Sequence, residues 1–223
     1  MRILLVEDDE LIGDSLRQGL VNHQYTVDWV KNGLAAWSAV QQEHFDLIIL
    51  DISLPKLSGE EVLKNIRNKN ITTPIIILTE ANTTESLVKH LDIGADDYIA
   101  KPFNLESLSA RIRTIRRRFN NMSADTLLKS GDVSLDPATR MVFKNEKMVE
   151  LSRREFMLLQ VLLENVGRVV RREQATQSMY GWGYDIDSNA LEVHVHNLRK
   201  KLELDNLATI RGVGYMLKKP VAD

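Results

Sequence analysis

The sequence predicts a doubly wound α/β domain built on a five-stranded parallel sheet, followed by a smaller α+β domain. Five short apolar runs recur in the first half of the chain, separated by longer amphipathic stretches. Three of these runs are apolar throughout rather than alternating, which is typical of strands covered on both faces. After Arg118 the pattern changes to short alternating runs bounded by turn residues. A chain of 223 residues is long enough for two such domains.

The first half alternates strands and helices. The apolar runs are expected to be strands at residues 3–6, 25–30, 47–50, 75–78 and 97–100. Apolar residues recur at helical spacing in four clear groups: Leu11, Leu16 and Leu20; Leu34, Trp37 and Val40; Val62, Leu63 and Ile66; and Leu105, Leu108 and Ile112. This alternation predicts a parallel sheet with helices on both faces. In such sheets the functional site lies beyond the carboxyl ends of the strands, where the strand order reverses.

A polar, unpatterned stretch at residues 119–126 is the predicted linker, so the expected domains are 1–118 and 127–223. Short alternating runs follow it, which predict a small antiparallel sheet. Their turn residues lie at 130–132, 136–137 and 144–146.

The remainder of the second domain has the pattern of three helices and a hairpin. Ser152 lies three residues before Glu155, which is the spacing of a capping box at a helix start. A shorter helix is expected from Arg171, a longer one from about 188 to 203, and a hairpin at 212–214. Three helices followed by a hairpin predict a helix-turn-helix with a wing, that is, a winged-helix domain.

Composition excludes several classes of protein. The formal charge of -2 argues against binding of nucleic acid over the whole surface, although it is compatible with one basic face. The absence of cysteine excludes disulfides and thiolate chemistry. The first apolar run is short and leads into Glu7, unlike a signal peptide, and no stretch approaches the roughly 20 apolar residues that span a bilayer. The chain is therefore expected to be cytoplasmic.

Carboxylates follow two of the predicted strands. Glu7, Asp8 and Asp9 come directly after the first strand, and Asp51 directly after the third. Those strands are neighbours in a doubly wound sheet, so the carboxylates are expected to converge. Acids after a strand are also common as solvated loop residues or helix caps. Their convergence would be relieved by a divalent cation, and hard oxygen ligands suit Mg²⁺.

The other two strand ends supply a hydroxyl and a cation. Thr79 ends the fourth strand, and Lys101 follows the fifth just before a proline. Either residue alone is ordinary, but together with the acids they form a set suited to one reaction. A carboxylate such as Asp51 can attack phosphorus, while cations neutralise the oxygens of the transferring group. We therefore expect a phosphoryl-accepting site.

The predicted helix near 188–203 has the pattern of a recognition helix. Its buried stripe is expected to be Leu191, Val195, Leu198 and Leu202. Its other face presents Asn189, Glu192, His194, His196, Asn197, Arg199 and Lys200. Such a mixture suits the edges and phosphates of a major groove. A solvated surface helix would have a similar pattern, whereas a metal site at the histidines is disfavoured because residues two apart diverge on a helix.

The expected hairpin strengthens the prediction of DNA binding. It carries Arg211 beside a glycine at its tip, where a cation can enter a narrow minor groove. Trp182 lies in a glycine-rich loop before the recognition helix. Such a tryptophan is commonly a core anchor, but it can also contact a partner.

These motifs resemble a known family over nearly the whole chain. Residues 1–118 are similar to a response-regulator receiver domain, which has a flavodoxin-like fold. Residues from about 127 are similar to the winged-helix effector of the OmpR/PhoB family, most like its PmrA/QseB branch. The resemblance implies a two-component transcription factor that is phosphorylated by a sensor histidine kinase and binds duplex promoter DNA.

The resemblance also implies a role for individual residues. Asp51 would be the phosphoacceptor, with Mg²⁺ held by Asp8, Asp51 and the main-chain carbonyl of Ser53, and by Glu7 through water. Thr79 and Tyr98 would form the switch, and Lys101 would contact the phosphoryl group. In the effector, Arg211 would enter the minor groove, Tyr215 would approach phosphate, and the loop of Trp182 would meet RNA polymerase.

The family's homodimer face on the fourth and fifth helices usually carries three ion pairs. Asp97 with Arg111, and Asp92 or Asp96 with Arg113, fit two of them. Leu87 and Ser107 stand where the third would be, so that pair is expected to be missing. Surface pairs are each worth roughly 0–1 kcal/mol, so dimerisation is expected to be altered rather than lost.

Two alternatives to a phosphorylation-dependent regulator remain at this stage. The residue after the switch threonine is usually small in the family, but here it is Glu80, whose charge would hinder phosphoryl transfer. A phosphorylation-independent DNA-binding regulator with a degenerate receiver is therefore the main alternative. A Mg²⁺-dependent phosphatase is less favoured, because it typically needs an acid where this chain has Ser53, so no enzyme activity of its own is expected.

Overall fold

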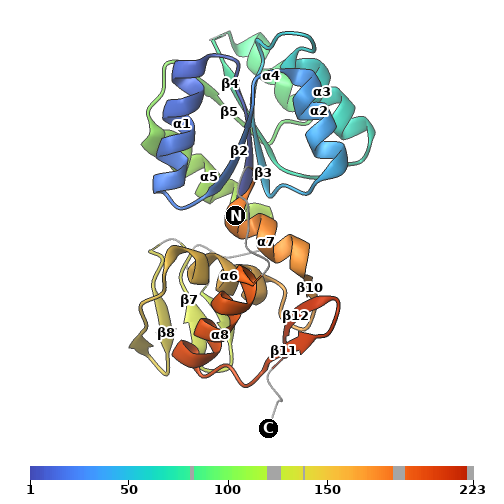
Figure 1. The fold of residues 1–223 in the computed structure, drawn as a ribbon. Coiled ribbons are helices and arrows are strands. Elements are labelled where there is room, and N and C mark those ends of the chain that lie inside the picture. Colours follow the sequence, from blue (N-terminus) through green and yellow to red (C-terminus); the bar gives the residue numbers. More distant parts are fainter. Residues whose placement is uncertain (81–82, 120–126, 138, 183–188, 220–223) are drawn as a thin grey trace. The chain divides into compact units, whose positions relative to one another are not determined.

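The computed structural model describes residues 1–80, 83–119, 127–137, 139–182 and 189–219. It divides into two compact units, Met1–Met122 and Ser123–Asp223 (Figure 1). Each unit has a hydrophobic core of its own. Residues 120–126 of the predicted linker lie outside the described residues. Among the described helices, none combines the length and the apolar character that a membrane span requires.

The first unit contains the predicted five-stranded parallel sheet, in the order β2-β1-β3-β4-β5. The strands are β1 (Arg2–Val6), β2 (Thr26–Val30), β3 (Leu47–Asp51), β4 (Ile75–Thr79) and β5 (Asp97–Ala100). The three central strands, β1, β3 and β4, are buried along their whole length. Their continuous apolar character is thus explained by helices on both faces. The order reverses between β1 and β3, which sets the place of the functional site.

Five helices cover the two faces of this sheet (Figure 1). They are α1 (Glu10–Asn22), α2 (Gly33–Gln42), α3 (Gly59–Asn68), α4 (Thr84–Ile93) and α5 (Leu105–Phe119). Figure 1 shows α1 and α5 on one face, and α2, α3 and α4 on the other. Two separate apolar clusters, one containing Leu63 and one containing Leu108, fill the two faces. The doubly wound prediction is therefore confirmed.

Helix α4 differs from the other helices of this unit in its packing. Its one buried residue is His90, while Val88 and Leu91 are exposed. This explains why α4 gives no clear apolar stripe in the sequence, because burial of a stripe is what produces that signal.

The second unit opens with an antiparallel sheet in the order β6-β7-β8-β9. Its strands are β6 (Leu128–Ser130), β7 (Val133–Leu135), β8 (Val142–Lys144) and β9 (Lys147–Met148). Helix α6 (Arg153–Glu164) follows and begins with the predicted capping box of Ser152 and Glu155. Nine consecutive residues of α6, Glu155–Leu163, are buried, so α6 is the central helix of this unit.

The helix-turn-helix and wing complete the second unit. Helix α7 spans Arg172–Tyr180 and α8 spans Ala190–Leu202. Helix α8 was predicted to begin at about residue 188, which lies outside the described residues. A three-stranded sheet in the order β10-β12-β11 follows. Its strands are β10 (Val170–Arg171), β11 (Leu207–Ile210) and β12 (Gly214–Leu217). Three helices with a terminal hairpin confirm the winged-helix prediction.

Candidate functional site

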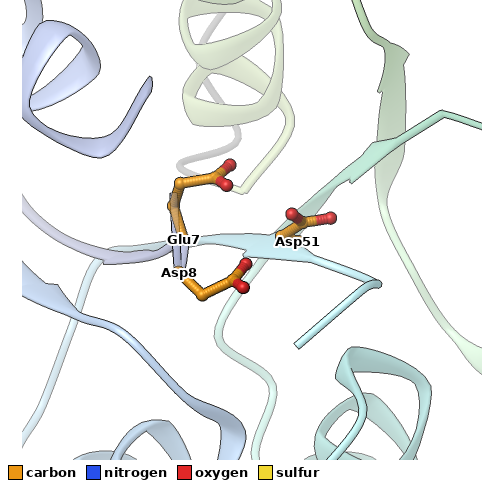
Figure 2. Close-up of side chains that lie close together, drawn as sticks. All are labelled: Glu7, Asp8 and Asp51. Atoms are coloured by element: carbon orange, nitrogen blue, oxygen red, sulfur yellow. The ribbon is translucent and has the colours of Figure 1, made fainter. Parts of the chain in front are cut away.

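The carboxylates predicted to converge do so at the end of the central strands. In the parallel pair of β1 and β3, Val6 is opposite Leu50, so Glu7 and Asp51 follow at the same edge (Figure 2). Oxygens of Glu7, Asp8 and Asp51 all lie within 4.8 Å of one another. Glu7 is 1% exposed and Asp51 3%, whereas Asp8 is exposed. We call these three residues the acidic pocket.

Asp9 does not join the acidic pocket. Its Oδ1 accepts hydrogen bonds from the main-chain nitrogens of Leu11 and Ile12, at 2.8 and 2.9 Å. Asp9 is therefore the N-cap of α1, the ordinary role for an acid before a helix.

The strand ends beyond the acidic pocket bring in Lys101 and Thr79. Lys101 Nζ lies 2.8 Å from Glu7 Oε2 and 2.8 Å from Asp51 Oδ2. The main-chain nitrogen of Lys101 donates to the carbonyl of Thr79 at 2.8 Å, and Thr79 is buried. The sheet topology thus unites an ammonium with two buried carboxylates that lie 94 and 50 residues away in sequence.

The electrostatics of the acidic pocket favour a second cation. Burial raises the pKa of Glu7, and the charge of Asp51 raises it further against the opposing hydrogen bond from Lys101. Burial disfavours the charge of Lys101, but its hydrogen bonds to Asp51 and Glu7 raise the pKa of its ammonium overall. One ammonium leaves three carboxylates incompletely neutralised. Clustered hard oxygens with residual negative charge are the donor set that Mg²⁺ prefers.

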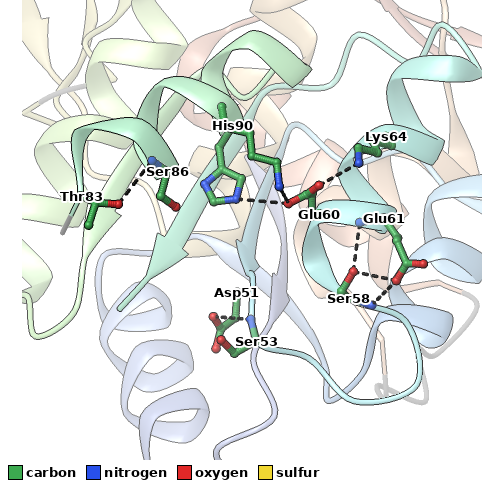
Figure 3. Close-up of polar contacts among 10 residues, drawn as sticks. Asp51, Ser53, Ser58, Glu60, Glu61, Lys64, Thr83, Ser86 and His90 are labelled. Atoms are coloured by element: carbon green, nitrogen blue, oxygen red, sulfur yellow. Dashed lines mark hydrogen bonds and ion pairs between the residues drawn. The ribbon is translucent and has the colours of Figure 1, made fainter. Parts of the chain in front are cut away.

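The loop after β3 holds Asp51 closely. The main-chain nitrogen of Ser53 donates to Asp51 Oδ1 at 3.2 Å (Figure 3). Gly59, at the start of α3, passes so near that a Cβ there would lie 2.0 Å from the carbonyl oxygen of Asp51. Only glycine permits this approach without a shift of the backbone. No sequence pattern singles out Gly59, because its contact with Asp51 depends on how the loop folds back.

A polar network joins α3 to α4 beside this loop (Figure 3). Glu60 accepts hydrogen bonds from Lys64 at 2.7 Å and from Lys89 at 2.6 Å, and His90 Nε2 lies 3.9 Å from Glu60. The bonds from Lys64 and Lys89 lower the pKa of Glu60 to about 2. The sequence analysis missed this link, because Glu60 and Lys89 are 29 residues apart and belong to different helices.

Tyr98 and its neighbours lie on β5 and α5. Tyr98 is partly buried against the apolar cluster on the α2, α3 and α4 face. Arg111 forms a 2.8 Å ion pair with Asp97, and its guanidinium carbon lies 5.9 Å from the centre of the Tyr98 ring. The ring of Tyr98 thus lies near Arg111, whose charge is balanced by Asp97.

In the second unit, α8 buries the predicted stripe and exposes part of the predicted polar face. Leu191, Val195, Leu198 and Leu202 are all buried. Among the predicted DNA-contacting residues of this helix, Asn189, His196 and Lys200 are exposed and Asn197 is half-buried.

Two residues of the predicted polar face are directed to intramolecular contacts. His194 is half-buried and lies 3.0 Å from the hydroxyl of Tyr180 on α7, a contact that the sequence pattern did not predict. Burial also lowers the pKa of His194, which favours the neutral ring. Arg199 donates to the carbonyl of Leu207 and to Thr209 Oγ1, both at 2.8 Å. Helical spacing distinguished buried from polar positions but not these inward-directed polar side chains.

The wing tip is exposed, whereas Tyr215 is buried. Arg211 and Val213 are exposed, and Gly212 has a φ of +72°, a conformation that favours glycine. Tyr215 is only 3% exposed and its hydroxyl accepts a 3.3 Å hydrogen bond from Arg172. The ring of Tyr215 belongs to the core of the unit, and its approach to phosphate stays a prediction. Trp182 is 38% exposed.

Comparison with known proteins identifies both units. Residues 3–113 match the family described as "Response regulator receiver domain", and residues 145–217 match "Transcriptional regulatory protein, C terminal". The chain is 47% identical over 220 residues to response regulator protein PmrA of Pseudomonas aeruginosa, with 99% of each chain covered. This chain belongs to the OmpR/PhoB family of two-component response regulators.

Further relatives of this response regulator agree. It is 41% identical to the transcriptional regulatory protein QseB of Escherichia coli O157:H7, over 97% of this chain and 99% of QseB. Its receiver is similar to a solved two-component response regulator from Clostridium difficile, with 34% identity and a TM-score of 0.51 over 54% of this chain and 98% of that one. The response regulator therefore combines a receiver domain with a DNA-binding domain of the OmpR type.

The residues expected at a dimer face of the response regulator have unequal surroundings. Asp92 and Arg113 are exposed. Asp96 instead forms a 2.9 Å ion pair with Arg67 and accepts a hydrogen bond from the main-chain nitrogen of Ile75 at 2.8 Å. Asp96 thus has partners within the receiver, whereas Asp92 is exposed, and the pairing of Arg113 with either residue stays a prediction.

Proposed function

We propose that this response regulator accepts a phosphoryl group on Asp51 from a sensor histidine kinase and thereby gains affinity for promoter DNA. The observation that carries the proposal is the pair of 2.8 Å contacts from Lys101 Nζ to Glu7 and Asp51 within the acidic pocket. A buried carboxylate beside an ammonium is suited to attack on phosphorus, because the cation balances charge on the transferring oxygens. The acceptor forms a P–O bond as the bond from phosphorus to the donor breaks.

The residues of the acidic pocket fit a bound Mg²⁺. Asp8, Asp51 and the main-chain carbonyl of Ser53 would hold it, with Glu7 acting through water. When bound, Mg²⁺ supplies charge neutralisation for the phosphoryl oxygens. Lys101, which contacts Asp51 and Glu7, would orient and balance the same oxygens, and the hydroxyl of Thr79 would donate to one of them.

Coupling to DNA would run through the switch residues. Movement of Thr79 toward a phosphoryl group leaves room for Tyr98, and the population shifts toward a receiver that pairs through α4 and α5. Asp97 and Arg111 pair within one copy and would pair across the homodimer instead, and Arg113 would pair with Asp92 or Asp96. Pairing of two effectors on adjacent half-sites then raises the affinity through effective concentration.

The proposed DNA surface is the outward side of α8 together with the wing tip. It comprises Asn189, His196, Asn197, Lys200 and Arg211. The amides are suited to adenine edges and the cations to guanine or phosphate. Trp182, which is 38% exposed, would contact RNA polymerase at a promoter.

Footprinting of the full-length protein on DNA, with and without a small acyl phosphate, tests acceptor, effector and their coupling together. We expect protection of a pair of half-sites at a lower protein concentration with the phosphodonor. Equal protection with and without it, together with phosphate stably bound to Asp51, would break the coupling. Equal protection without any bound phosphate would favour the phosphorylation-independent alternative, in which Glu80 hinders transfer.

A further inference from the structure

We propose that Arg199 and Arg172 are positioning residues, which fix the wing against α8 so that both elements reach the DNA together. The wing is defined as β11, β12 and the turn at 211–213. This inference rests on the proposed contact of the wing with DNA. It assigns Arg199 a role different from the direct DNA contact that the sequence predicted.

Arg199 joins α8 to the first strand of the wing. Its Nε and Nη2 donate to the carbonyl of Leu207, at 3.2 and 2.8 Å, and Nη2 also donates to Thr209 Oγ1 at 2.8 Å. Leu207 begins β11 and Thr209 lies two residues further along it. Because the donors of a guanidinium are fixed in one plane, bonds to two successive positions of a strand define the direction of that strand.

Arg172 joins the wing to the remaining elements of the helix-turn-helix. Its main-chain nitrogen donates to the carbonyl of Val213, at the wing tip, at 3.1 Å. Its side chain donates to the hydroxyl of Tyr215 on β12 at 3.3 Å and pairs with Glu192 on α8. One residue at the start of α7 thus contacts the wing tip, a wing strand and α8.

These contacts act together with the burial of Leu207, Tyr215 and Leu217 in the core of the unit, and they add fixed directions that apolar burial alone does not supply. The two strands of the wing pair with each other at four positions, and β12 pairs with β10 at only two. A two-stranded hairpin is marginally stable by itself, so its orientation depends on the elements that it contacts. A wing whose orientation is fixed before binding loses less conformational entropy when the complex forms. Its affinity for DNA is therefore higher. The cation at the tip, Arg211, then reaches DNA in a fixed relation to α8.

A double-mutant cycle on the full-length protein tests this inference. The probe is a duplex enriched from a random-sequence pool by the unaltered protein, and affinity is measured by fluorescence anisotropy. We expect Arg211→Ala to weaken binding about tenfold, as for loss of one good DNA contact. In an Arg199→Ala background the same change should weaken binding less than about threefold, because contacts that act as one unit are not additive.

Lys200→Ala is the matched control for Arg199→Ala. Lys200 follows Arg199 directly on α8 and is exposed, whereas Arg199 is half-buried against the wing. The effect of Lys200→Ala should therefore add fully to that of Arg211→Ala. Thr209→Val removes one acceptor of Arg199 and no charge, so it should weaken binding about twofold and also reduce the effect of Arg211→Ala.

Two results would overturn the inference, and they are distinguishable. Full additivity of Arg199→Ala and Arg211→Ala, as for Lys200→Ala, would show that Arg199 contacts DNA independently of the wing. No effect of Arg211→Ala alone would refute the proposed wing contact itself, and this inference with it. If Arg199→Ala lowers the melting temperature too far for the measurement, Thr209→Val and Arg172→Ala carry the same cycle. Additivity of both with Arg211→Ala would likewise overturn the inference.

Discussion

The acidic pocket and the DNA surface are built in different ways. In the pocket, each residue follows a strand end, and the parallel sheet brings the ends to one edge. On α8, by contrast, polar residues on neighbouring turns have different roles. Lys200 is exposed, whereas His194 contacts Tyr180 and Arg199 contacts the wing. The sheet topology alone is enough to locate the acidic pocket. To locate the DNA surface, the direction of each side chain on α8 must also be known.

The sharpest test of the pocket is removal of the acceptor. Asp51→Ala should abolish acyl-phosphate formation, because it removes the proposed acceptor carboxylate, which lies 2.8 Å from Lys101 Nζ. Incorporation of labelled phosphate from an acyl phosphate, with base-labile release, measures it. Asp14→Ala, on the exposed side of α1, should label normally. Undiminished labelling of Asp51→Ala would remove the acceptor assignment.

A second test concerns the backbone that supports the pocket. Gly59→Ala forces a Cβ to within 2.0 Å of the carbonyl of Asp51, and should lower the free energy of receiver unfolding by about 2–4 kcal/mol. The control is Gly19→Ala, where the nearest atom is the flexible end of Leu105 at 2.5 Å, and the change should stay within about 1 kcal/mol. Urea unfolding followed by tryptophan fluorescence compares them. Equal losses would contradict this account of Gly59.

A third test separates the two kinds of residue on α8. Lys200→Ala should reduce the salt dependence of DNA binding by about one released counterion, without changing stability. His194→Ala should instead destabilise the second unit by about 1 kcal/mol through loss of the contact with Tyr180, with the salt dependence unchanged. Titrations of a duplex at several salt concentrations and thermal unfolding give both quantities. The reverse outcome would show that His194 faces DNA.

The smallest expected effect concerns the charge of Glu7. Its native pKa is raised above 4.5, so ionisation destabilises the fold, and the stability present below the unfolded pKa is lost as pH rises through the native pKa. Without Mg²⁺, Glu7→Gln should therefore raise the free energy of unfolding at pH 7.

The advantage of Glu7→Gln should vanish below the unfolded pKa, because the carboxyl of Glu7 is then protonated in both states. Added Mg²⁺ should stabilise the unaltered protein more than the variant. Denaturation curves at several pH values, with and without Mg²⁺, provide the measurement. A variant less stable than the unaltered protein at neutral pH would contradict the proposed electrostatics of the pocket.

Sequence reasoning succeeded where one repeated signal determines the structure. The uninterrupted apolar strands predicted a sheet covered on both faces, and the residues after them, such as Asp51 and Lys101, followed from its topology. It did not predict that Tyr215 is buried or that Asp96 pairs with Arg67. In both cases a polar group is satisfied by a residue distant in sequence, and no local pattern marks that residue.

The sequence by itself determined the fold of each unit, the family and the group of residues at the strand ends. These follow from hydrophobic periodicity and from the geometry of parallel strands, which are local or topological properties. Only the tertiary structure decided that Lys101 bridges two acids, that Gly59 lies against Asp51 and that Arg199 holds the wing. The physical reason is that the direction of a polar side chain depends on which hydrogen-bond partner lies near it in space. That partner is brought near only when the chain has folded.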